Sequence, residues 1–185
     1  MAKTAALLIA TGSEEAEAVN TFDILIRGGI DAKVVSTIDS LTVECSRKIK
    51  IVADVFLKDV ADHLYDVVIL PGGMPGVEHF MNNDKVGTFV KNHFQAEKLV
   101  AAICAAPMAL KKHNIAHGFK ATAYPSIGEE VSDFFKFDKT HKVLVDKNLI
   151  TSQGPGTSFD FGLKILEIMV NKDKADQVAA GMLLN

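Results

Sequence analysis

The chain has 185 residues, the size of one domain, and its 48% apolar and 23% charged residues lie near the average for globular proteins. This composition argues against a disordered, collagen-like or coiled-coil protein. The 20 Lys and Arg residues against 23 Asp and Glu residues give a net charge of −3, so charge gives no reason to expect nucleic acid or an anionic membrane as the main partner.

Short apolar segments alternate along the chain with longer amphipathic segments. We predict strands at residues 5–10, 34–36, 67–70, 99–103 and 149–151. We predict helices at residues 14–27, 84–95, 105–112, 157–170 and 173–183. Because the strands are apolar on both faces, the alternation predicts an α/β sandwich. It would have a mostly parallel sheet with helices on both faces, in a single domain over residues 1–185.

The first predicted helix follows Ser13, whose hydroxyl suits an N-cap, and ends at Gly28-Gly29. Its core-facing stripe is predicted to consist of Val19, Phe22, Leu25 and Ile26.

Residues 41–54 break the alternation. They contain two strand-like pieces, 42–44 and 49–52, on either side of Cys45-Ser46-Arg47-Lys48, which predicts a small β-hairpin excursion. Residues 135–146 are interpreted as a second candidate hairpin, with Lys139-Thr140 near its turn.

The two cysteines, Cys45 and Cys104, do not make a disulfide framework, which favours a reducing, intracellular compartment. The apolar run 5–10 leads into Thr11-Gly12-Ser13-Glu14-Glu15 rather than a small-residue cleavage site, so it predicts a strand and not a signal peptide. No apolar stretch approaches the roughly 18 residues of a membrane span. We therefore expect a soluble, cytoplasmic protein.

Cys104 stands between a buried strand and a helix, with small alanines on both sides. This pattern resembles a nucleophile elbow, in which a sharp strand-to-helix turn exposes one side chain. The N–H groups at the start of the helix would favour the thiolate. Spacing alone leaves the alternative open that Cys104 is a small buried core residue.

Two neighbouring segments carry polar groups toward the same edge of the sheet. Backbone N–H groups of Gly73 and Ala105 could form an oxyanion hole, although the residues alone favour an ordinary strand-to-helix turn as the interpretation of Pro71-Gly72-Gly73. Glu14, Glu15 and Glu17 open the first helix, where acids commonly complement the helix dipole. The helical wheel places Glu15, not Glu17, on the core side, so periodicity does not select Glu17.

The six histidines are scattered, and none has a metal-ligand spacing with a Cys or acid cluster. We therefore predict no metal site and expect most of the histidines to lie on the surface.

Four motifs in order, residues 12–17, 68–73, 102–107 and 151–157, together resemble the DJ-one (ThiJ/PfpI) superfamily. The similarity is greatest to the branch of the Parkinson-associated protein and its bacterial and protist relatives. The resemblance implies a flavodoxin-like fold and a homodimer. It also implies that Cys104 is the reactive cysteine and that Glu17 is a buried, protonated acid that hydrogen-bonds its sulfur.

By the same resemblance, Gly73 and Ala105 match the backbone donors. Arg27, Arg47 and Ser152 match polar positions near the dimer interface. Members of the superfamily often have a histidine before a proline beside the cysteine, but here Tyr124 precedes Pro125. A Cys–Glu pair is therefore expected rather than a Cys-His-Glu triad, with Tyr124 as a possible hydrogen-bond donor to substrate.

The resemblance implies a cofactor-independent enzyme that acts on reactive dicarbonyls or glycated substrates. It would convert methylglyoxal to lactate (glyoxalase III type), with a protein deglycase activity as a further possibility, and protect against oxidative stress. The alternative is an oxidation sensor or redox-regulated chaperone, in which Cys104 forms a sulfinate stabilised by Glu17.

Two other activities found on this fold are disfavoured by single residues. The peptidase branch has a histidine directly after the cysteine, where this chain has Ala105. Glutamine amidotransferases have a His and Glu pair near the C-terminus, but this chain has no histidine after His141.

Overall fold

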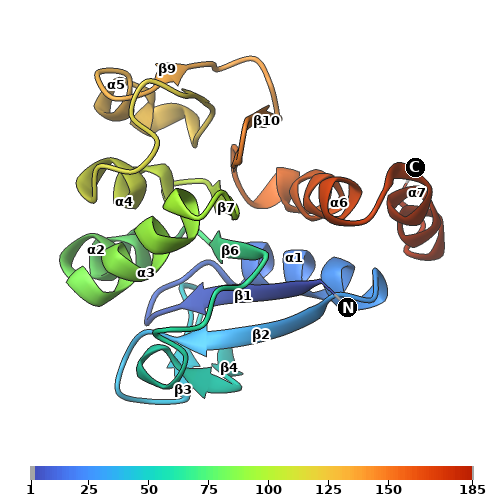
Figure 1. The fold of residues 1–185 in the computed structure, drawn as a ribbon, viewed down its shortest axis with the longest axis horizontal. Coiled ribbons are helices and arrows are strands. Elements are labelled where there is room, and N and C mark those ends of the chain that lie inside the picture. Colours follow the sequence, from blue (N-terminus) through green and yellow to red (C-terminus); the bar gives the residue numbers. More distant parts are fainter. Residues whose placement is uncertain (1–2, 185) are drawn as a thin grey trace.

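The computed structural model describes residues 3–184 and has a seven-stranded sheet at its centre (Figure 1). The strands in spatial order are β10 (Val143–Asp146), β11 (Leu149–Ser152), β7 (Leu99–Ile103), β6 (Val67–Leu70), β1 (Thr4–Ile9), β2 (Asp31–Ser36) and β5 (Val55–Phe56). All neighbouring strands are parallel except β10 and β11, which are antiparallel. The predicted α/β fold with a mostly parallel sheet is confirmed.

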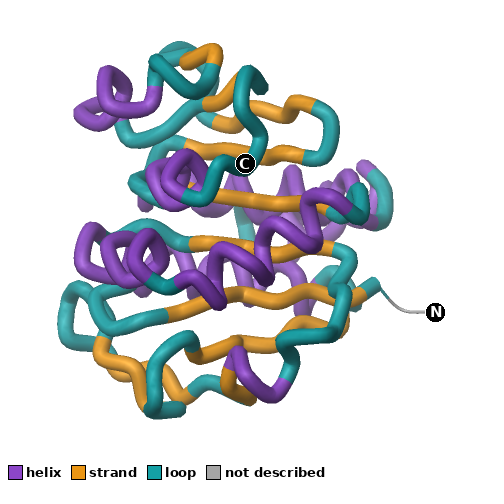
Figure 2. Tube along the Cα trace, turned by 60° about the vertical axis from the view of Figure 1, so that its left-hand side comes forward, coloured by secondary structure: helices purple, strands orange, loops and turns teal. Residues whose placement is uncertain are grey.

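Helices cover both faces of the sheet, in front of and behind the strands in Figure 2. One face carries α1 (Glu15–Arg27), α6 (Ser158–Met169) and α7 (Lys172–Gly181). The other carries α2 (Met74–Asn82), α3 (Asp84–Gln95), α4 (Pro107–Lys112) and α5 (Gly128–Val131). Alternate residues of β1 enter the two cores, Leu7 on the first face and Leu8 on the second.

The predicted hairpin is present, with β3 (Thr42–Glu44) antiparallel to β4 (Lys50–Val52). The prediction of a second hairpin within residues 135–146 was wrong. β9 (Lys136–Phe137) pairs in parallel with β8 (Lys120–Ala121), and β10 pairs with β11 instead. Each piece of that segment finds its partner outside it, so local alternation could not identify the pairing.

The start of α1 differs from the prediction. Its N-cap is Glu14, whose carboxyl accepts from the N–H of Ala16 at 3.4 Å. Ser13 instead turns its hydroxyl back to accept from the N–H of Ala10 at 3.0 Å, which tightens the turn after β1.

The predicted core stripe of α1 is displaced around the helix. Val19 and Ile26 are 50% and 48% exposed, whereas Thr21, Ile24 and Leu25 are buried. The reason is that α6 packs closely across α1, at a point where a side chain in place of Gly162 would meet Ile24 at 2.9 Å. The two outward-facing residues leave part of α1 apolar and uncovered.

Helix α2 was not predicted from the sequence, because Met74-Pro75-Gly76 indicates a turn. Pro75 instead occupies the first turn of the helix, where its missing N–H costs no hydrogen bond. Similarly, α4 begins at Pro107 rather than at Ala105, so residues 104–106 form a turn between β7 and the helix.

Candidate active site

Cys104 follows the last residue of β7 with a φ of +63°, a left-handed conformation that is uncommon for a residue with a side chain. Hydrogen bonds on both sides hold it there. The N–H of Cys104 donates to the carbonyl of Ser152 at 3.0 Å, and the carbonyl of Cys104 accepts from the N–H of Tyr124 at 2.9 Å. The side chain is therefore presented at the carboxyl end of the sheet, as the nucleophile-elbow interpretation predicts.

Glu17 reaches the same point from the first turn of α1. Its side chain is 1% exposed, and Oε2 accepts from the N–H of Gly72 at 2.6 Å. The carboxyl group lies beside the Cys104 thiol and acts on its pKa, and its second oxygen, Oε1, is buried with no other hydrogen-bond partner within residues 3–184. A side chain at Gly72 would lie 2.6 Å from Cys104 Cβ and 2.9 Å from Glu17 Oε2, so only glycine lets the two groups meet.

The pKa of Glu17 is raised to about 7, chiefly by burial and to a smaller extent by the charge of Glu14, while the interactions with Gly72 and Cys104 oppose the rise. A substantial share of the Glu17 side chains therefore carry a proton at neutral pH. The resemblance implies a buried, protonated acid at this position, and its role stays a prediction.

The sequence suggested that the start of a helix makes the Cys104 thiol more acidic. The structure differs, because the pKa of this thiol is raised. The pKa of Cys104 is raised to about 12, first by burial and second by the Glu17 carboxylate. Burial also raises the pKa of Cys45, to about 11. Because two adjacent acids in a buried site do not both ionise near neutral pH, Cys104 and Glu17 hold at least one proton between them. The thiolate belongs to the state in which Glu17 carries that proton.

The two predicted backbone donors both reach the sulfur. The N–H groups of Ala105 and Gly73 hydrogen-bond Cys104 and lower its pKa, against the larger effect of burial. Gly73 has a φ of +85°, a conformation that directs its N–H toward the site and favours glycine. The same donors can stabilise negative charge on an oxygen bonded to the adduct.

Cys104 opens into a cavity of about 450 Å³. Its walls include Met74 and Ile127 on the apolar side and Glu14 and Arg47 on the charged side. Tyr124 also lines the cavity and is 46% exposed, and within residues 3–184 its hydroxyl has no hydrogen-bond partner. This hydroxyl is therefore free to contact a molecule in the cavity.

Two of the polar residues named from the resemblance do not line this cavity. Arg27 pairs with Asp23 at 2.9 Å on the exposed side of α1. Ser152 is buried and donates to the carbonyl of Lys142 at 2.8 Å. Arg47 does line the cavity, at its exposed mouth.

Ser46 is a site residue that sequence reasoning missed. It lines the cavity, and its hydroxyl lies 2.7 Å from Glu14 Oε2 and 2.8 Å from Glu15 Oε2. The N–H of Arg47 donates to Glu15 Oε1 at 2.8 Å. The hairpin turn is thus attached to the first turn of α1. The sequence signal that could have indicated a partner for these acids was their grouping at the start of α1. That grouping was explained by the helix dipole alone.

The histidines lie outside the cavity, and one of them is an exception to the predicted surface location. His93 is 1% exposed, and its ring Nδ1–H donates to the carbonyl of Phe89 at 2.7 Å. Its Nε2 accepts from the N–H of Tyr65 at 2.9 Å. Over residues 3–184 there is no group of three or more His, Cys, Asp and Glu side chains arranged to hold a metal ion.

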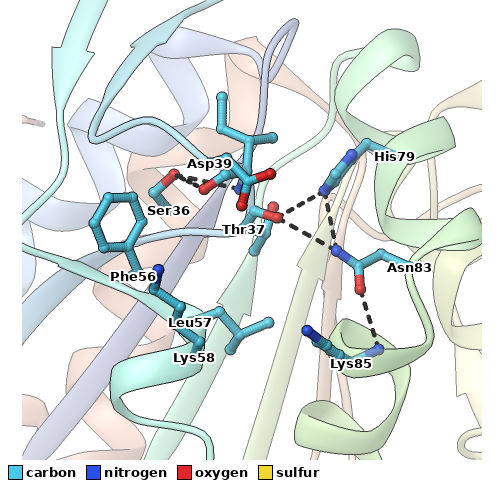
Figure 3. A pocket seen from close by; sticks show the side chains of 10 residues that line it. Ser36, Thr37, Asp39, Phe56, Leu57, Lys58, His79, Asn83 and Lys85 are labelled. Atoms are coloured by element: carbon cyan, nitrogen blue, oxygen red, sulfur yellow. Dashed lines mark hydrogen bonds between the residues drawn. The ribbon is translucent and has the colours of Figure 1, made fainter.

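A second cavity, of about 360 Å³, lies at the carboxyl end of β2 and shares no residue with the first (Figure 3). The carbonyl of Thr37 accepts there from His79 Nε2 at 3.0 Å and from Asn83 Nδ2 at 3.3 Å. The hydroxyl of Ser36 donates to the carbonyl of Ser40 at 2.6 Å. These polar groups bind one another and no cysteine lines the cavity, so we assign the chemistry to the Cys104 cavity.

No helix within residues 3–184 has the length and apolar character needed to cross a membrane.

Comparison with known proteins places these features in context. The model of the DJ-1/PfpI family matches residues 3–168. The crystal structure of Drosophila melanogaster DJ-1beta is 39% identical, with a TM-score of 0.98 over 100% of both chains. Oxidized Toxoplasma gondii DJ-1 is 35% identical, with a TM-score of 0.93 over 98% of both chains. A Caenorhabditis elegans protein named glutathione-independent glyoxalase DJR-1.2 is 33% identical over 93% of this chain and 91% of its own.

Proposed function

The chain belongs to the DJ-1/PfpI family, and from this premise we propose that it is a cysteine-dependent, cofactor-independent enzyme that converts methylglyoxal to lactate. One observation carries the proposal. The Cys104 sulfur is in contact with a buried acid that shares its proton and with the N–H groups of Gly73 and Ala105. A nucleophile, a proton carrier and oxyanion donors are the groups that this reaction needs.

The reaction begins with transfer of the thiol proton of Cys104 to the Glu17 carboxylate. Sγ then forms a bond to the aldehyde carbon, and the oxygen takes the proton back from Glu17 to give a hemithioacetal. The N–H groups of Gly73 and Ala105 stabilise the negative charge on that oxygen as it forms.

Glu17 next moves a proton between the two carbons. As a carboxylate it removes the hydrogen of the former aldehyde carbon to give an enediolate. The hydroxyl proton on that carbon passes to the neighbouring oxygen, and Glu17 returns its proton to the neighbouring carbon. The product is a thioester on Cys104. Water cleaves the C–S bond, releases lactate and restores the thiol. The net change is addition of one water, without an external oxidant or reductant.

The test measures lactate formed from methylglyoxal, without glutathione and with a chelator present. Wild type is expected to turn over and Cys104→Ala to be inactive, because the covalent adduct cannot form. Glu17→Gln should lose roughly 10²–10⁴-fold, the usual contribution of a positioned acid–base group. Lactate production by wild type no faster than by Cys104→Ala would refute the proposal.

Tyr124 is assigned a smaller role, contact with substrate through its free hydroxyl. Tyr124→Phe removes at most one hydrogen bond and is expected to reduce turnover much less than Glu17→Gln. A variant as inactive as Cys104→Ala would instead place Tyr124 in the chemistry, in the position where relatives have a histidine.

A second function uses the same groups. A sulfinate on Cys104 would place its oxygens among the N–H groups of Gly73 and Ala105 and the protonated Glu17, which favours oxidation that stops at this stage. Mild peroxide followed by mass mapping tests this sensor role. Wild type should accumulate the sulfinate, and Glu17→Ala should change the product distribution. Identical products from both would leave Glu17 without a role in oxidation.

We further propose that the protein is a homodimer formed through α1 and the hairpin. Val19 and Ile26 on α1, and Ile49 and Val52 on the hairpin, are between 48% and 69% exposed. Between these two elements lies a mostly apolar cavity of about 390 Å³. A two-fold axis would let this surface cover its own copy.

A further inference from the structure

Glu14 is the charged residue that α1 contributes to the wall of the Cys104 cavity. Its position is fixed from two sides. Its N–H donates to the carbonyl of Gly72 at 2.9 Å, and the hydroxyl of Ser46 lies 2.7 Å from Oε2. Gly72 in turn donates its own N–H to Glu17, so the carboxylate is held beside the reacting pair.

Other charged groups near this wall do not neutralise Glu14. Glu15 is buried, faces the hairpin turn and does not line the cavity. Arg47 lines the mouth, but within the described chain its guanidinium contacts only the carbonyl of Ser46, at 3.5 Å, and forms no ion pair. Cys45 is a buried thiol and Glu17 shares its proton with Cys104. A molecule that approaches Cys104 therefore passes a fixed carboxylate without a bound counter-charge.

We propose that Glu14 is a specificity-determining residue of this site, and that its negative charge favours neutral carbonyl electrophiles and disfavours those with a carboxylate. The substrate class is then uncharged dicarbonyls such as methylglyoxal, rather than α-oxo acids such as glyoxylate. The substrate assignment rests on the proposed function, whereas the charge selection at Cys104 does not.

The charge of Glu14 also acts on Glu17 and raises its pKa, which supports the placement of the carboxylate within reach of the pair. Two unit charges separated by several ångströms of partly hydrated cavity interact by about 1 kcal/mol, which corresponds to roughly fivefold in rate.

The experiment compares two electrophiles of similar size, neutral iodoacetamide and anionic iodoacetate. Their rates with Cys104 are measured by peptide mass mapping, and the ratio of the two rates cancels any change in the thiolate fraction. In Glu14→Gln the iodoacetate rate relative to iodoacetamide should rise about three- to tenfold. The matched control is Glu78→Gln, which removes an exposed acid of α2 that does not line the cavity, and its ratio should equal that of wild type.

Salt gives a second test that needs no folded variant. Because salt screens charges, the iodoacetate-to-iodoacetamide ratio of wild type should rise between about 20 mM and 500 mM NaCl. An unchanged ratio in Glu14→Gln, an equal change in Glu78→Gln, or no salt dependence in wild type would each overturn the proposal. Charge selection without methylglyoxal turnover would refute the proposed function alone. Turnover without charge selection would refute only the role of Glu14.

Discussion

Glu17 is placed where its neutral form is favoured, and this gives stability a particular dependence on pH. Burial raises its pKa from 4.5 to about 7, so the folded protein binds the proton more tightly than the unfolded chain does. The stability that this proton contributes is fully present below pH 4.5. It declines as pH rises toward 7 and is lost at higher pH. The full change corresponds to about 3 kcal/mol.

The prediction is that Glu17→Gln removes this part of the pH dependence. Its free energy of unfolding, measured with urea between pH 4.5 and 8, should fall less with rising pH than that of wild type. Glu15→Gln serves as the control and should keep the wild-type decline through this range. A decline of equal size in Glu17→Gln would show that other groups cause it.

Gly72 is the residue on which the contact between Cys104 and Glu17 depends. Gly72→Ala would place a carbon 2.6 Å from Cys104 Cβ, so the cysteine or the acid must move. We expect a loss of about 1–3 kcal/mol in stability, measured by urea unfolding, together with a changed rate of Cys104 alkylation by iodoacetamide. Gly181→Ala is a suitable control because its added carbon meets nothing within 4 Å. Wild-type reactivity in Gly72→Ala would mean that the site tolerates a wider separation.

At the scale of the elements, His93 attaches α3 to the start of β6. The N–H of Tyr65 needs an acceptor and the carbonyl of Phe89 needs a donor, so the ring is neutral with its hydrogen on Nδ1. Burial lowers the pKa of His93. As pH falls, the unfolded chain therefore protonates His93 at a higher pH than the folded protein does. Stability falls as pH drops below about 6.5.

His93→Phe should remove this acid dependence and also destabilise the protein by about 2–3 kcal/mol, because it leaves the Tyr65 N–H buried without a partner. Urea unfolding at pH 5 and pH 7.5 measures both effects. The exposed His63, exchanged for Gln, provides the comparison. If His93→Phe were as stable as wild type at pH 7.5, the two hydrogen bonds would contribute nothing.

The elements show which parts of the fold local sequence determines. The five predicted strands are buried on both faces, so their apolar runs identify them without knowledge of their partners. The segment 135–146 was misread because its two strands do not pair with each other: β9 pairs with the earlier strand β8, and β10 pairs with β11, which follows it. In α1, Val19 and Ile26 follow a helical apolar period but point away from the core, so periodicity identified an apolar face without showing what covers it.

In the whole molecule, the site combines groups from three neighbouring strands. Cys104 follows β7, Gly73 follows β6, and Glu17 lies in the helix after β1, and these strands are adjacent in the sheet. Their meeting at the carboxyl edge was predictable from the order of motifs. The selection of Glu17 over Glu15 was not, because both are buried and only the three-dimensional position of Gly72 distinguishes the two carboxyls. The family resemblance supplied that choice.

The proposed dimer gives the last prediction, at this largest scale. Val52 on the hairpin is 69% exposed, so in a monomer Val52→Asp would cost little stability. In a two-fold dimer through this surface, the change would bury two like charges near the axis and shift the equilibrium toward monomer. Light scattering at micromolar concentration should therefore show dimer for wild type and a smaller species for Val52→Asp.

Val145→Asp is the matched control, since Val145 is 42% exposed on β10, at the opposite edge of the sheet from β5. It should remain a dimer. If Val145→Asp dissociated while Val52→Asp stayed dimeric, the interface would lie at the β10 edge instead. A monomeric wild type would mean that α1 and the hairpin expose their apolar side chains to water.

Because Ser46 attaches the hairpin to Glu14, a dimer through the hairpin also predicts that Val52→Asp alters the electrophile preference of Cys104. The iodoacetate-to-iodoacetamide ratio measures that connection directly.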